Sequence, residues 1–171
     1  MSYSNNKKGL DRKEYMLDKL EILKPRIEDQ VEINNLARQV HKLHVNWNPD
    51  LFLDVEQVIP IDRFRKLLET ESIYIAKQEN KIVGYIIINI IEKDNGFIRY
   101  RKLLSIDTLC IDEKYRGQGI GTRMLEFAKE LGRNNGCTDM HLTVNPQNTN
   151  AIKVYEKFGM EVDKIAYMMK L

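Results

Sequence analysis

The segment from residue 103 to residue 144 constrains the fold of this chain more than any other part of it. Leu103–Ile111 is an apolar run of the kind found in strands, and Met140–Val144 has the same character. Two such strands joined through a helix require a right-handed parallel crossover. The helix is predicted from apolar residues spaced three and four apart and ends at Gly136; these residues are Ile120, Met124, Leu125, Ala128 and Leu131.

The other segments predict mostly antiparallel elements around this unit. Their order, β-α-α-β-β-β-α-β-α-β, predicts one mixed α/β (α+β) domain with a mostly antiparallel sheet, one parallel pair and helices on both faces. Apolar periodicity and turn residues place strands at Leu20–Leu23, Ser72–Lys77, Lys81–Ile91 and Ile165–Met169, and helices at 28–45, 61–68 and 151–158.

Composition and charge indicate a single globular domain. The chain has 171 residues, about one domain's length, and is 43% hydrophobic and 30% charged. Its 27 basic and 25 acidic residues leave +2, so no nucleic-acid partner is expected from net charge. The basic excess lies in residues 1–26, with seven Lys or Arg against four Asp or Glu. We expect residues 1–19 to be an N-terminal extension, partly disordered or helical, which is either solvated or binds a partner, and residues 20–171 to form the domain.

Cysteines and apolar runs indicate the compartment. Cys110 and Cys137 are too few for a disulfide framework and are typical of a reducing compartment. The long apolar stretch Ile82–Ile91 is too short to span a bilayer. Met1–Gly9 has no hydrophobic segment after its lysines, unlike a secretory signal. The sequence therefore predicts a soluble cytoplasmic protein with no membrane partner.

A glycine-rich turn, Arg116-Gly117-Gln118-Gly119-Ile120-Gly121, joins the first strand of the crossover to its helix. Glycines can adopt positive φ and let a ligand approach the backbone closely. Free N–H groups at a helix start favour phosphate oxygens. By itself this turn is either a tight connection or a phosphate-binding loop. No Gly-Lys-Ser/Thr follows, and the glycine spacing is not that of a dinucleotide fingerprint.

A second pattern follows the last strand of the crossover: Asn148-x-x-Ala151-x-x-x-Tyr155-x-x-Phe158-Gly159. Together with 106–121, it resembles the GNAT superfamily of acyl-CoA-dependent N-acetyltransferases. The family's loop pattern, Arg/Gln-x-x-Gly-x-Gly/Ala, matches Arg116, Gly119 and Gly121. The element order from residue 20 onward also resembles the family, whereas residues 1–19 lie outside the resemblance.

The resemblance implies that acetyl-CoA binds where the strands Leu103–Ile111 and Met140–Val144 part, and it implies no metal. The backbone of Leu109, Cys110 and Ile111 would hold the pantetheine arm. Asn148 would bond this arm or merely cap the following helix. The pyrophosphate would be bound by the loop residues Arg116, Gly117, Gln118, Gly119, Ile120, Gly121 and Thr122.

The same resemblance implies a transfer of acetyl from acetyl-CoA to a primary amine by direct attack in a ternary complex. Tyr155 would protonate the CoA thiolate, a transfer between groups of comparable basicity; otherwise it is a core aromatic. An N–H of Leu109 or Cys110 would stabilise the oxyanion. Asp107 is the first candidate for the general base, ahead of two neighbouring acids, Asp112 and Glu113.

Several alternatives stay open at this point. The chain could be a non-catalytic acyl-CoA-binding module, or an acetyltransferase whose basic tail binds RNA, and a homodimer is left open. For several residues a functional role and a packing role both stay open. The functional roles are metal binding for His41 and His44, a nucleophile for Cys110, a base for His141, and walls of the acceptor site for Trp47, Leu51 and Phe52.

Overall fold

The computed structural model describes residues 17, 19–97 and 99–169. The predicted extension 1–19, including a helical pattern near Leu10–Leu17, lies almost entirely outside these described residues. The strands are β1 Leu20–Leu23, β2 Ile73–Gln78, β3 Lys81–Lys93, β4 Arg101–Ile111 and β5 Asp139–Leu142. The helices are α2 Gln30–Trp47, α3 Ile61–Glu69, α4 Ile120–Asn134 and α5 Thr149–Phe158, with short 3-10 helices at Ile27–Asp29 and Glu113–Tyr115.

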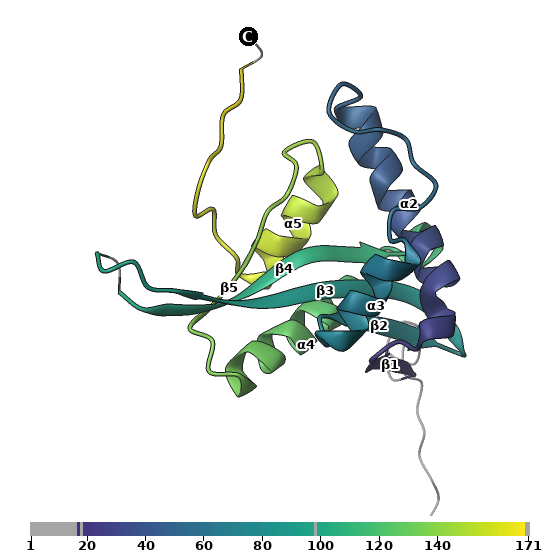
Figure 1. Cartoon of the computed structure of the whole chain (residues 1–171), viewed down its shortest axis with the longest axis horizontal. Helices are drawn as coiled ribbons and strands as arrows, with labels where there is room; N and C mark the ends of the chain where they lie inside the picture. The colour runs from purple at the N-terminus through teal and green to yellow at the C-terminus, as the bar shows by residue number, and fades with distance from the viewer. Residues whose placement is uncertain (1–16, 18, 98, 170–171) are drawn as a thin grey trace, which may run out of the picture.

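The five strands form one sheet in the order β1-β2-β3-β4-β5. The first four strands pair antiparallel with their neighbours, whereas β4 and β5 are parallel. Helix α4 connects these two parallel strands, which confirms the predicted crossover. β3 and β4 extend beyond the rest of the sheet as a long hairpin (Figure 1).

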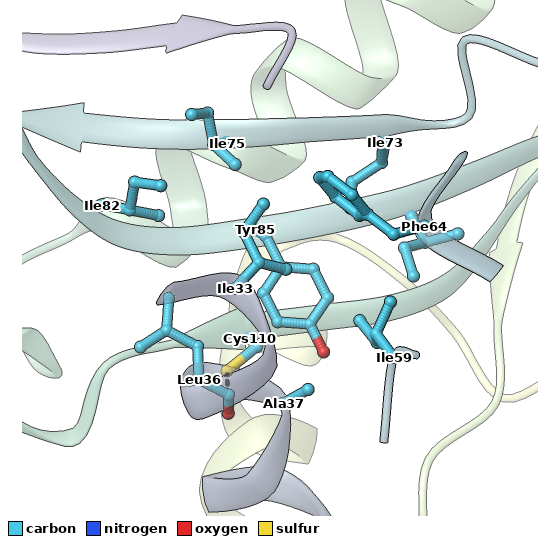
Figure 2. Close-up of a cluster of buried hydrophobic side chains, with 11 residues drawn as sticks. Ile33, Leu36, Ala37, Ile59, Phe64, Ile73, Ile75, Ile82, Tyr85 and Cys110 are labelled. Atoms are coloured by element: carbon cyan, nitrogen blue, oxygen red, sulfur yellow. Dashed lines mark hydrogen bonds between the residues drawn. The ribbon is translucent and has the colours of Figure 1, made fainter. Parts of the chain in front are cut away.

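Helices cover both faces of the sheet, as the sequence predicts. α2 and α3 pack on one face around fully buried Ile33 and Phe64, and Tyr85 from β3 joins this cluster (Figure 2). α4 packs on the other face through Met124 and Leu125. Figure 1 shows α4 on the side of the sheet opposite α2 and α3. Within the described residues, no helix has the length and apolar character to cross a membrane.

The predicted strand at Ile165–Met169 is wrong. After α5, residues 160–169 carry no regular secondary structure and project from the body of the molecule (Figure 1). Apolar side chains in this segment are highly exposed, including Ile165 at 71% and Tyr167 at 92%. A strand needs a neighbouring strand for its backbone hydrogen bonds, and within the described residues β5 pairs only with β4.

Candidate functional site

The parallel strands β4 and β5 touch over a short length and then separate. Leu103 pairs with Asp139 at one end of the contact, and Ile106 pairs with Leu142 at the other. β4 continues to Ile111 beyond the last pair, whereas β5 ends there. A cavity of about 190 Å³, the cleft, opens between the separated segments. Its walls come from α2, β3, β4, α5 and the segment that follows β5.

A β-bulge lies in β4 where the cleft begins. Ile87 of β3 pairs with Thr108, but the next β3 residue, Ile88, pairs with Ile106. Asp107 is therefore the extra residue of β4. Such a bulge bends its strand, increases the local twist and redirects a side chain. The bend accounts for the parting of β4 from β5, and it brings Asp107 into the wall of the cleft.

The Asp107 carboxylate is held by two side chains of the sheet. Oδ2 accepts a hydrogen bond from Nδ2 of Asn89 at 2.7 Å, and Oδ1 accepts one from Oγ of Ser105 at 3.1 Å. Each carboxylate oxygen has a second lone pair, so both oxygens can accept one more hydrogen bond. The predicted general base is thus oriented by its neighbours and borders the cleft. Asp112 and Glu113 do not border it.

Backbone groups of β4 alternate between the two edges of the strand. Asp112 donates its N–H to a β3 carbonyl at 2.9 Å, so Cys110, two residues earlier, also directs its N–H toward β3. Leu109 and Ile111 therefore present their backbone groups to the opposite edge, from which β5 has separated. The Ile111 carbonyl accordingly accepts from Nε of Arg116 at 3.0 Å. Of the two predicted oxyanion donors, this geometry favours the N–H of Leu109.

The Cys110 side chain faces away from the cleft into the core under α2. Its Sγ donates to the Leu36 carbonyl at 3.3 Å, the dashed contact in Figure 2. Burial raises the pKa of this thiol to about 12, so it stays protonated near neutral pH. A buried thiol is a poor nucleophile. The Cys110 side chain therefore has a packing role and not that of a nucleophile.

The glycine-rich loop has the conformation that its composition predicts. Gly117 and Gly119 have φ of 77° and 91°, in the left-handed region that disfavours side chains. Gly119 is the N-cap residue of α4, whose first intrahelical bond is from the N–H of Arg123. In the described part of the chain, none of the N–H groups from Gly117 to Thr122 has a hydrogen-bond partner. A run of free N–H groups at a helix start is a binding site for an anion.

The loop side chains differ in their surroundings. Ile120 is 2% exposed and packs in the core, so only its backbone can reach a ligand. Gly121 has an ordinary helical backbone, and a Cβ there would lie 3.8 Å from Ile111 Cγ1, which is a normal contact. Gln118 donates to the Lys114 carbonyl at 3.4 Å.

Tyr155 and Asn148 approach the cleft from α5 and its N-terminus. Tyr155 is half-buried, and burial raises the pKa of its phenol, which keeps the group protonated at neutral pH. Oδ1 of Asn148 accepts from the N–H of Ala151 at 3.3 Å, so Asn148 caps α5. This cap leaves its Nδ2 available to the cleft.

Three further titratable residues line the cleft: His41 and His44 from α2, which the sequence analysis considered only as metal ligands, and Tyr85 from β3, which it did not consider. His41 Nε2 lies 2.7 Å from the Leu53 carbonyl and therefore carries the proton. Burial, followed by the nearby His41, lowers the pKa of His44, which leaves it neutral at pH 7. The signal available in the sequence was the spacing of three between the two histidines on a helix face.

The remaining predicted candidates lie around these residues. Trp47 and Phe52 pack their rings on His44, with centroid distances of 5.4 and 5.3 Å, and do not line the cleft. Leu51 is 62% exposed. His141 lies in β5, outside the cleft, and within the described residues its Nδ1 is buried without a hydrogen-bond partner.

Comparisons with known proteins agree with this geometry. A family model described as the acetyltransferase (GNAT) family matches residues 37–160. A mutant of the BH1408 protein from Bacillus halodurans has a similar structure, with a TM-score of 0.85, 28% identity and coverage of 88% of this chain and 99% of that one.

Two curated relatives match shorter segments. An uncharacterized N-acetyltransferase of Methanocaldococcus jannaschii is 26% identical over 97 residues, or 57% of this chain and 42% of the relative. The spermine/spermidine N(1)-acetyltransferase of Bacillus subtilis is 33% identical over 57 residues, or 33% of this chain and 38% of the relative. The matches thus span about two fifths of these two relatives.

Proposed function

Because the chain belongs to the acetyltransferase (GNAT) family, we propose that it transfers an acetyl group from acetyl-CoA to a primary amine by direct attack within a ternary complex. The observation that carries this proposal is one cleft that brings several groups together. It is bordered by the phenol of Tyr155, by the proton acceptors Asp107 and His44, and by the backbone edge of β4 from which β5 has separated. Both substrates can meet there with their reacting atoms adjacent.

The donor half of the site is the free edge of β4 and the loop before α4. The N–H groups from Gly117 to Thr122 would bind the pyrophosphate, helped by the positive end of the α4 dipole. The freed backbone groups of Leu109 and Ile111 would hold the pantetheine arm, with Nδ2 of Asn148 nearby. This arrangement places the thioester carbonyl near the N–H of Leu109, which would stabilise the oxyanion of the tetrahedral intermediate.

The step starts from the neutral amine, so an acceptor that arrives as an ammonium ion first releases one proton to water. The chemical step itself then needs one proton removed and one supplied. The amine nitrogen forms a bond to the thioester carbon, and the carbon–sulfur bond then breaks. The attacking nitrogen loses a proton to Asp107, directly or through a water, and the CoA thiolate takes one from the phenol of Tyr155. His44 is a further cleft group that can accept a proton, since its lowered pKa keeps it neutral.

We further propose that the acceptor is an amine that arrives as an ammonium ion. Asp107 is the carboxylate on the cleft wall, and its charge favours a cation there. The name of the Bacillus subtilis relative, a spermine/spermidine acetyltransferase, points to the same substrate class.

Turnover of acetyl-CoA against a panel of polyamines, diamines and lysine-like amines tests this function. We expect amine-dependent release of CoA thiol and formation of the acetylated amine. Binding of acetyl-CoA without turnover on any amine would instead favour a non-catalytic acyl-CoA-binding module.

The choice of base is tested with Asp107→Asn and His44→Gln. Each variant keeps the approximate size of its side chain and removes a proton acceptor. If Asp107 is the base, its variant alone loses about 10²-fold or more in kcat, the usual contribution of general base catalysis. A selective loss in the His44 variant would assign the base to α2.

A further inference from the structure

The hydroxyl of Tyr85 lies at a place that packing alone would fill with a phenylalanine ring. The Tyr85 side chain is 2% exposed and packs among apolar residues under α2 (Figure 2). Burial raises the pKa of its phenol, so the hydroxyl keeps its proton at neutral pH. Within the described residues this hydroxyl makes no hydrogen bond. Proteins rarely leave a buried polar group unsatisfied, because doing so costs stability.

Tyr85 faces the cleft from the side of the sheet that α2 covers. In Figure 2 its oxygen points away from β3, toward Ala37 of α2 and Ile59. Ala37 lines the cleft, and so does Tyr85 itself. The hydroxyl is therefore presented to whatever occupies the cleft, and a ligand there can supply the hydrogen bond that the described residues do not.

Tyr85 lies a short distance along the sheet from Asp107. Tyr85 and Ile87 are two positions apart in β3 and share a face. Ile87 pairs with Thr108, the residue after Asp107 in β4. Two positions of a strand span about 7 Å, so the cleft offers a carboxylate and a phenol that far apart along the sheet. Apolar side chains line the same cleft: Ala37, Val40 and Val58.

We propose that Tyr85 selects the acceptor by a hydrogen bond to a second polar group, at the far end of an alkyl amine whose reacting nitrogen lies at Asp107. This inference rests on the proposed function and narrows its acceptor to bifunctional amines, such as amino alcohols and diamines. The phenol can donate to that group or accept from it. A simple alkyl amine is disfavoured, because its methyl end would separate the hydroxyl from water and leave it unpaired.

Two acceptors of equal size test this proposal: aminobutanol, with its hydroxyl at the far end of the chain, and pentylamine, with a methyl group in its place. We expect wild-type kcat/KM to favour aminobutanol by about tenfold or more. Tyr85→Phe keeps the ring and should reduce this ratio to about one. Its affinity for acetyl-CoA should be unchanged, because the hydroxyl contacts the acceptor and not the donor.

The matched control is Tyr74→Phe, the same change at a half-buried tyrosine of β2 outside the cleft, which should keep the wild-type preference. The Tm of Tyr85→Phe should not fall, since the folded chain loses no hydrogen bond with the hydroxyl. A clear fall in Tm would mean that the hydroxyl has a partner within the protein and would overturn the proposal.

The other outcomes separate Tyr85 from acetyl transfer itself. Equal turnover of the two acceptors by the wild type would mean that water satisfies the hydroxyl, and the proposal would fail while the transferase activity stood. Weaker acetyl-CoA binding in Tyr85→Phe would place the hydroxyl at the donor and also overturn it. If no amine is acetylated, calorimetry with aminobutanol on the CoA-saturated protein decides. Binding that Tyr85→Phe loses supports the role of Tyr85 without the activity, whereas binding to neither protein refutes both.

Discussion

At the scale of single residues, Tyr155 decides whether the cleft is catalytic. Tyr155→Phe keeps the ring and removes the phenol proton, so kcat should fall by about tenfold or more. General acid catalysis usually contributes about 10²–10⁴-fold, and the lower bound allows water to replace the phenol in part. Acetyl-CoA affinity should change little, and the free energy of unfolding should fall by less than about 1.5 kcal/mol. Steady-state kinetics, calorimetry and denaturant unfolding measure the three quantities.

The matched control for this prediction is Tyr74→Phe. Tyr74 is also a half-buried tyrosine packed against the α4 core, with its ring 4.8 Å from that of Phe127, but it lies outside the cleft. Unchanged turnover in both variants would return Tyr155 to a packing role. A joint loss of stability and cofactor binding in the Tyr155 variant would mean that its hydroxyl is structural.

A second prediction at this scale concerns His44 and the dependence of stability on pH. Its pKa is lowered in the folded protein, so below the usual histidine pKa of about 6.5 the unfolded chain binds more protons than the folded one. The stability from keeping His44 neutral is therefore present above that pH and is lost as the pH falls. Thermal unfolding from pH 7.5 to 5 should show a steeper decrease in Tm for the wild type than for His44→Gln. Parallel curves would contradict the assigned pKa shift.

At the scale of elements, a prediction concerns the loop before α4, and a second glycine with positive φ serves as its control. Gly119→Val should abolish acetyl-CoA binding, because the new side chain would stand where phosphate approaches the backbone. It should also destabilise the fold by about 1–2 kcal/mol, since φ is 91°. Gly136→Val, where φ is 70° and no atom lies within 4 Å of the new Cβ, carries the same backbone strain far from the loop.

Calorimetry with acetyl-CoA on both variants separates the effect of backbone strain from the loss of the binding site. The Gly136 variant should bind normally despite its lower stability. Gly121→Val adds a third arm: a Cβ fits there without clash or positive φ, so loss of binding cannot be attributed to strain. Retained affinity in folded Gly119 and Gly121 variants would show that the glycines form only a turn.

At the scale of the whole molecule, ligand binding and folding are linked. The glycine-rich loop before α4 and the freed edge of β4 exist together only in the folded chain, so acetyl-CoA should raise Tm. At one hundred times its dissociation constant, the ligand should stabilise the fold by about 2.7 kcal/mol. A thermal-shift titration measures this, with free adenine as the control ligand that lacks phosphates. No shift and no calorimetric heat at millimolar acetyl-CoA would contradict the entire site.

The sequence by itself determined the elements up to α5, the loop before α4, and the positions of Asn148 at the start of α5 and of Tyr155 within it. Helix and strand periods, the glycines before α4 and the Asn148 to Gly159 pattern are local signals, since each depends on residues a few positions apart. They correctly predicted the crossover, the loop and the α5 residues that reach the cleft. Each of these could be predicted without knowing what packs against it.

Only the tertiary structure decided how these pieces meet. The bulge at Asp107 depends on the register between β3 and β4, and the entry of His41 and His44 into the cleft depends on how α2 packs over the sheet. Neither is encoded in local spacing. The strand predicted at Ile165–Met169 illustrates the same limit, because strand composition is local whereas a strand exists only where another offers its edge. Within the described residues no strand pairs with this segment.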